Sequence, residues 1–119
     1  MNFLQLGKIV RALGYSLAGF AVLMKTRSAR QETLFAAFGM LIFALISARL
    51  AEYLTFIAVF LLVLCAEAVN TAIELNADKI SPEQSDYARD TKDLGSFAVL
   101  CVLLVWLGYF VWVVAKNIS

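Results

Sequence analysis

One apolar stretch of the chain ends in a row of polar side chains that could do proton or metal chemistry. The segment FIAVFLLVLC is followed by Glu67, Asn70, Glu74 and Asp78. On a helix of 3.6 residues per turn, Glu74 and Asp78 lie within about 20° of Glu67 around the axis. Asn70 lies about 60° to one side. The spacing therefore predicts a single polar face, on which Glu67 lies about 10 Å deeper along the axis than Glu74.

A carboxylate at the depth of Glu67 is a costly choice for a purely structural residue, because a charge in the membrane costs at least about 2.5 kcal/mol. Two structural explanations are open. Burial could keep the carboxyl group protonated, or a cation such as Arg30 or Lys92 could pair with it from a neighbouring helix. The amide and the two further acids on the same face favour a functional role.

Two further polar clusters lie at the ends of apolar segments. RDTKDLGS contains Lys92 and Asp93, and RSARQE contains Arg30 and Glu32. A cation beside carboxylates at a boundary between water and lipid suits a phosphate group, which needs positive charge and, with Mg²⁺, oxygen ligands. The alternative for Lys92 and Asp93 alone is a snorkelling lysine beside a solvated aspartate.

The composition indicates an integral membrane protein. Of its 119 residues, 62% are hydrophobic and 16% are charged, whereas a soluble domain has about 45–50% apolar residues. A membrane-spanning helix needs about 20 apolar residues, and the chain offers such windows at 53–73 and 94–115. A shorter window gives a third span at 33–50, with the stems of Arg49 and Glu52 snorkelling at the far membrane surface.

Residues 1–29 are interpreted as a helix that lies in the membrane surface. Apolar side chains recur at helical spacing from Leu6 to Phe20, whereas Lys8, Arg11 and Tyr15 share a different stripe. The modest apolar content favours an amphipathic surface helix over a fourth span. The polar stripe could simply anchor the helix to anionic lipids, or Lys8 and Tyr15 could also face a cytoplasmic ligand.

Positive charge is concentrated before the first span and in the loop between the second and third spans. Under the positive-inside rule, the N-terminus and the loop at 73–93 are therefore cytoplasmic. Within this loop, Ser81 and Pro82 are typical of a helix start, with Ser81 as the N-cap. Small residues such as Ala68 and Gly95 allow membrane helices to approach closely, which favours a homo-oligomer. The net charge of +1 gives no indication of nucleic acid binding.

Several kinds of site are excluded by the residue types. The absence of histidine from the sequence removes Ser-His and Cys-His catalysis and the usual zinc sites. Cys65 and Cys101 fall within spans and are interpreted as small core residues without a redox role. The three polar clusters converge on the cytoplasmic side, where ATP from water could meet an acceptor from lipid. The sequence contains no P-loop and no protein-kinase motif, so a kinase here would have an uncommon fold.

Four motifs span nearly the whole chain: GYS at 14–16, RQE at 30–32, EAVNTAIE at 67–74 and KDLGSFAVL at 92–100. In these motifs the chain resembles the small bacterial membrane diacylglycerol kinases, whose superfamily includes the undecaprenol kinases. The resemblance implies an all-α membrane protein with one domain over 1–119. It also implies one surface helix and three transmembrane helices per chain, arranged as a homotrimeric bundle with active sites between subunits.

The resemblance further implies a lipid kinase of the bacterial inner membrane that transfers the γ-phosphoryl group of MgATP to diacylglycerol and forms phosphatidic acid. Its partners would be ATP and a membrane lipid, without nucleic acid. By position, Glu67 would be the general base and Glu74 the Mg²⁺ ligand. The implied ATP-binding residues are Lys8, Tyr15, Glu74, Glu83, Lys92 and Asp93. The implied lipid and catalytic pocket consists of Arg30, Glu32, Glu67, Asn70 and Ser96.

One departure from the family and one difference from its sister branch shape the alternatives. The family usually has a second metal-binding Glu just before RQE, but this chain reads LMKTRSARQE, so Glu74 would hold Mg²⁺ alone or with Glu32. Mg²⁺ commonly uses one or two carboxylates plus substrate phosphates. Undecaprenol kinases tend to read K-D-x-A-A-G, so Gly95 and Ser96 favour diacylglycerol. A non-catalytic relative and a small cation-coupled transporter, in which Glu67 would carry the ion, complete the alternatives.

Overall fold

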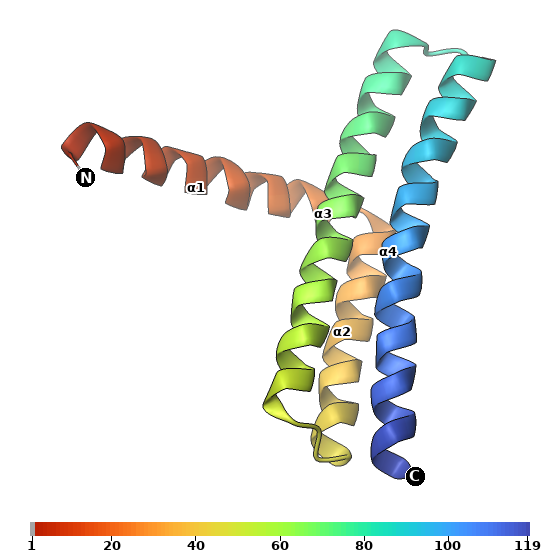
Figure 1. The fold of residues 1–119 in the computed structure, drawn as a ribbon. Helices are drawn as coiled ribbons and strands as arrows, with labels where there is room; N and C mark the ends of the chain where they lie inside the picture. The colour runs from red at the N-terminus through yellow and green to blue at the C-terminus, as the bar shows by residue number, and fades with distance from the viewer. Residues whose placement is uncertain (1) are drawn as a thin grey trace.

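The computed structural model describes residues 2–119, which form four helices and no strand. These are α1 (Phe3–Leu23), α2 (Arg27–Leu45), α3 (Leu50–Ile80) and α4 (Asp86–Ile118). In Figure 1, α2, α3 and α4 run side by side as a bundle, and α1 projects sideways from it. The expected all-α fold is confirmed.

Three helices are long and apolar enough, by length and composition alone, to cross a membrane: α1, α3 and α4. The spans expected at 53–73 and 94–115 fall within α3 and α4. The expected span at 33–50 falls on α2, which is not among the three, since charged residues occupy its first turns. Length and composition thus give α1 as the third candidate membrane span, whereas the sequence pattern favoured 33–50. In the bundle, however, it is α2 that packs against α3 and α4 (Figure 1).

An aromatic core holds α2 against α3 and α4. Phe43, Phe56 and Trp106 are almost completely buried. The ring centroids of Phe43 and Phe56 are 5.0 Å apart, and those of Phe56 and Trp106 are 5.2 Å apart. Aromatic pairs at such distances contribute about 0.5–1.5 kcal/mol beyond the burial of their area. Gly39 lets α2 approach closely, because a Cβ atom there would lie 2.6 Å from Cζ of Phe56.

The turn between α3 and α4 differs from the expected one. Ser81 is the C-cap of α3, and the N-cap of α4 is Ser85, whose hydroxyl accepts a hydrogen bond from the backbone N–H of Ala88 at 3.1 Å. The predicted helix start at Ser81 and Pro82 is therefore wrong. The physical reason is that the hydroxyls of Ser81 and Ser85 hydrogen-bond to each other at 2.9 Å, which places Ser81 in the turn and leaves Ser85 to cap the helix.

The N-terminal helix is shorter than the segment 1–29. It ends at Leu23, and Thr26 caps the next helix, with its hydroxyl accepting from the backbone N–H of Ala29 at 3.4 Å. The hydroxyl of Thr26 also donates to the carbonyl of Leu23 at 2.7 Å. The segment RSARQE therefore forms the first turns of α2, where Ser28 and Glu32 line the same cavity as Glu67 of α3.

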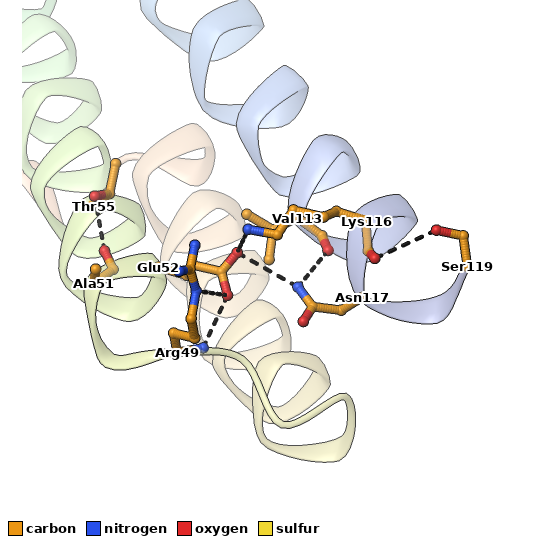
Figure 2. Close-up of polar contacts among 8 residues, drawn as sticks. All are labelled: Arg49, Ala51, Glu52, Thr55, Val113, Lys116, Asn117 and Ser119. Carbon is orange, nitrogen blue, oxygen red and sulfur yellow. Dashed lines mark hydrogen bonds and ion pairs between the residues drawn. The ribbon is translucent and has the colours of Figure 1, made fainter.

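Glu52 lies at the end of the bundle that is farthest from the α3–α4 turn (Figure 2). Its Oε1 accepts from the backbone N–H of Arg49 at 2.9 Å, and its Oε2 lies 3.1 Å from Nζ of Lys116. Asn117 donates to the same Oε2 at 3.5 Å. The expectation that Glu52 snorkels at the surface is wrong, because these partners satisfy a side chain that is only 2% exposed. This far-end cluster ties the start of α3 to the end of α4.

The single chain leaves many large apolar side chains exposed on all four helices. Cys65 and Cys101 are free and exposed as well. Within one chain, the expectation that they are core residues is therefore wrong, because both lie on the outer faces of their helices. In a membrane protein, such faces are covered by lipid or by other membrane helices.

Candidate functional site

Glu67 is buried where α3 passes the start of α2. Its side chain is 4% exposed, and its Oε2 accepts a hydrogen bond from Oγ of Ser28 at 3.3 Å. Neither suggested cation neutralises it, since no ion pair within residues 2–119 involves Glu67 and Lys92 pairs with Asp78. A cavity of about 390 Å³ opens beside it, and its lining residues are Ser28, Gln31, Glu32, Phe35, Glu67, Leu103, Trp106 and Leu107.

A second carboxyl group meets Glu67 in this cavity. Glu32 projects from α2, just before the expected span at 33–50, and its Oε2 is buried without a hydrogen-bond partner. Burial, together with the neighbouring carboxyl group of Glu67, raises the pKa of Glu32 to about 8. The structure therefore brings together two of the residues expected in the catalytic pocket.

Asn70 and Glu74 continue the polar face of α3. Nδ2 of Asn70 donates to Oε1 of Glu74 at 3.2 Å, and the Glu74 carboxylate is exposed. Oδ1 of Asn70 is buried and has no hydrogen-bond partner. It lies against Gly95 of α4, where an added Cβ atom would overlap Oδ1 and lie 3.2 Å from Cγ. The absence of a side chain at Gly95 thus gives the Asn70 amide its position.

A polar cleft of about 430 Å³ lies at the turn between α3 and α4. Glu83, Lys92 and Asp93, which are three of the expected ATP-binding residues, line it. Nζ of Lys92 forms an ion pair with Oδ1 of Asp78. Both partners are substantially exposed, so the pair is accessible to water and to a charged ligand.

Other expected site residues lie apart from these groups within one chain. Lys8 and Tyr15 are exposed on α1, which projects from the bundle (Figure 1), and neither lines the cleft of Lys92. Arg30 and Ser96 are exposed near the site on α2 and α4. Their side chains form no ion pair and no hydrogen bond with any residue of the described chain, 2–119.

The donor set fits a metal ion shared with a nucleotide. Residues 2–119 contain no group of three or more Asp, Glu, Cys or His side chains that could hold a metal ion. One exposed carboxylate, that of Glu74, is available beside Asn70, and Mg²⁺ commonly combines one or two carboxylates with substrate phosphates. Within one chain, Glu32 faces Glu67, two helical turns deeper than Glu74, so Glu32 does not join Glu74 as a ligand of the same ion.

Comparison with known proteins assigns the chain to a family. The family model described as prokaryotic diacylglycerol kinase matches residues 14–114. The chain belongs to the prokaryotic diacylglycerol kinase family. Proteins named diacylglycerol kinase from Sinorhizobium sp, Pseudomonas aeruginosa and Escherichia coli K12 are 39%, 37% and 30% identical to it. These alignments cover 87%, 84% and 82% of this chain and 75%, 82% and 81% of the relatives. The resemblance and the assignment to a membrane-embedded lipid kinase are confirmed.

The region matched by the diacylglycerol kinase family contains every expected site residue except Lys8. It also contains two site residues whose contacts the sequence did not predict, Ser28 and Gly95. Ser28 and Glu32 are four residues apart on one helix, so their shared face was a usable signal. The contact between Gly95 and Asn70 joins two helices and left no local signal in the sequence.

Proposed function

We propose that this chain transfers the γ-phosphoryl group of MgATP to the free hydroxyl of diacylglycerol and forms phosphatidic acid. The observation that carries the proposal is the buried carboxylate of Glu67, which adjoins a cavity between α2, α3 and α4. Family membership supports the reaction type. The polar face of α3 supports the geometry, since it leads from this cavity toward the cleft of Lys92.

Glu67 acts as the general base in this proposal. Its carboxylate takes the proton of the acceptor hydroxyl while the hydroxyl oxygen attacks the γ-phosphorus atom. The bond from that phosphorus to the bridging oxygen breaks, and ADP leaves with the electron pair. Such base catalysis typically contributes about 10²- to 10⁴-fold. The burial of Glu67 limits competition by water as the acceptor.

The remaining groups position the nucleotide. Glu74 would hold Mg²⁺ together with substrate phosphates, and the ion would neutralise charge on the transferring phosphoryl group. Lys92 supplies positive charge, and Asp93 and Glu83 line the same cleft. Asn70 orients the Glu74 carboxylate through its hydrogen bond.

The outlying residues complete the site in a homotrimer with active sites between subunits. The position of Lys8 and Tyr15 on the projecting α1 supports contacts with the nucleotide of a neighbouring subunit. The exposed side chains of Arg30 and Ser96 bind the lipid substrate at the edge of the cavity. The exposed apolar faces of the single chain support an assembly of this kind.

The proposed membrane placement follows the charge distribution. Segments 33–50, 53–73 and 94–115 cross the bacterial inner membrane, and α1 lies on its cytoplasmic surface. The N-terminus and the α3–α4 turn face the cytoplasm. The clustering of Lys and Arg before residue 33 and in the loop at 73–93 supports this orientation, and the projection of α1 from the bundle supports its surface location.

The test is a kinase assay in mixed micelles with labelled ATP, Mg²⁺ and either diacylglycerol or undecaprenol. Protein from a host without its own diacylglycerol kinase avoids contaminating activity, and Glu67→Gln is a control of matched size. We expect labelled phosphatidic acid from the wild type and a loss of at least about 10²-fold in the variant. Preference for undecaprenol would transfer the assignment to the sister branch. Lipid binding without turnover, or ion uptake without ATP that Glu67→Gln abolishes, would reject the kinase proposal.

A further inference from the structure

Two acids from different helices meet in the cavity that the proposed acceptor would enter. Glu32 of α2 and Glu67 of α3 line the same cavity of about 390 Å³, and Ser28, one helical turn before Glu32, donates a hydrogen bond to Glu67 at 3.3 Å. Two ionised carboxylates in contact repel each other, and neither can donate a hydrogen bond to the other. The pair therefore requires either a nearby cation or a proton.

Within residues 2–119, no cation lines the cavity that the pair shares. On the side of α4, the cavity is lined by Leu103, Trp106 and Leu107, and the remaining lining residues of α2 are uncharged. Within residues 2–119, neither acid forms an ion pair. Arg30, on α2, is exposed and does not line the cavity. The titratable groups that face the pair are therefore Glu32 and Glu67 themselves.

The two acids differ in their hydrogen-bond partners. Oε2 of Glu67 accepts from Oγ of Ser28, whereas Oε2 of Glu32 is buried without a partner. A buried acceptor without a donor is unfavourable. A protonated carboxyl group has an O–H donor, and an ionised one accepts only. One proton on Glu32 would thus supply the missing hydrogen bond and remove the repulsion.

We propose that Glu32 carries a proton at neutral pH and donates it in a hydrogen bond to Glu67, so that the pair holds one negative charge, located on Glu67. This inference rests on the proposed function for the role of Glu67 as the base. Glu32 is then a positioning residue, because its O–H and the hydroxyl of Ser28 orient the Glu67 carboxylate. A carboxylate has about four lone-pair positions, which leaves room for the acceptor hydroxyl. During transfer, the hydroxyl proton goes to Glu67 and Glu32 keeps its own.

The pair also gives the site a dependence on pH. The pKa of Glu32 is raised to about 8, first by burial and then by the neighbouring carboxyl group of Glu67. Since a raised carboxyl pKa keeps the neutral form up to that pH, the proton is present at neutral pH and is lost as the pH rises through this value. Above it, the pair carries two negative charges, which repel the γ-phosphoryl group and leave Glu67 without its donor.

The direct test is an infrared pH titration of the purified protein in lipid. We expect the absorption of a protonated carboxylic acid at neutral pH, lost with a midpoint near pH 8, and absent in Glu32→Gln. Asp90→Asn, which removes an exposed acid outside the site, should keep the band. A wild-type spectrum without the band at neutral pH overturns the proposal. The titration needs no substrate, so it tests the pair separately from the proposed function. If the protein shows the band but no kinase activity, the proposed function is rejected and the protonated pair is supported.

The second test compares the pH profiles of kcat. Glu32→Gln keeps a hydrogen-bond donor of the same size without a charge, so it should lose less activity than Glu32→Leu and should lose the decline that the wild type shows at alkaline pH. Glu32→Leu lacks the donor and should lose about 10- to 100-fold, the range of a hydrogen bond to a charged group. A merely structural role would lower stability without changing the shape of the profile. The proposal is overturned if kcat of Glu32→Gln still declines at alkaline pH as it does in Asp90→Asn. This outcome can be read even if Glu32→Leu fails to fold.

Discussion

Gly95→Ala tests whether the contact between α3 and α4 sets the position of the site amide. A Cβ atom at Gly95 would overlap Oδ1 of Asn70 and lie 3.2 Å from its Cγ. Either the amide turns away or the helices separate at this level. Because Nδ2 of the same amide donates to Glu74, both movements disturb the carboxylate that we propose as the Mg²⁺ ligand.

The expected magnitudes differ between stability and activity. Replacement of a helical glycine by alanine favours folding by about 1 kcal/mol, and insertion of a methyl group into a packed contact typically costs about 1–3 kcal/mol. The free energy of unfolding should therefore fall by at most about 2 kcal/mol. Activity should fall further, because a displacement of about 1 Å of a positioned group can cost about 10²-fold in rate.

The assay measures kcat in mixed micelles and the midpoint of thermal unfolding for each variant. Gly108→Ala is the matched control, since it lies on the same helix and an added Cβ atom there would meet nothing within 4 Å. It should keep the wild-type kcat and lose no stability. In an Asn70→Ala background, Gly95→Ala should cost no further activity, because the clash disappears with the amide. The reasoning is refuted if Gly95→Ala keeps the wild-type kcat, or if its effect is undiminished in that background.

Two further variants probe the framework around the site. Gly39→Ala would place a Cβ atom 2.6 Å from Cζ of Phe56 in the aromatic core. After the gain of about 1 kcal/mol in helix propensity is subtracted, the free energy of unfolding should fall by about 1–2 kcal/mol; an unchanged unfolding curve would contradict this. Glu52→Gln removes a buried charge that lies 3.1 Å from Nζ of Lys116, so the unfolding midpoint should fall while kcat at a temperature below the transition stays at the wild-type value. A loss of kcat with an unchanged midpoint would show that the far-end cluster acts on the site itself.

The polar face of α3 was predictable because it depends only on helical geometry. The angles between Glu67, Asn70 and Glu74 follow from the repeat of the helix, and the structure confirms that Glu67 is buried and that Asn70 contacts Glu74. The partners from other helices were not predictable in this way. That Ser28 meets Glu67 and that Gly95 meets Asn70 depends on the packing depth of α2 and α4, which distant side chains determine.

The ends of the helices show the same limit. Ser81 and Ser85 are both suitable N-caps by their type, and only the continuation of α3 to Ile80 makes Ser81 a C-cap and leaves Ser85 to begin α4. At the other end of the bundle, the end of the segment 33–50 predicted that the stem of Glu52 snorkels at the far membrane surface. Its burial requires Lys116, which arrives from the other end of the chain and lies too far along the sequence for any local pattern to reveal.

The arrangement separates the two halves of the proposed reaction. The proposed base Glu67 and the proposed metal ligand Glu74 lie on one helix, about 10 Å apart along its axis, so their spacing is fixed by α3 alone. The partners of the base come from α2, and the contact that positions Asn70 comes from α4. A shift of α2 along α3 should therefore change the pH dependence of kcat with little effect on the KM for ATP. A shift of α4 should instead change the KM for ATP. The ion pair of Glu52 with Lys116 opposes such a shift, because it joins α3 and α4 at their far end (Figure 2).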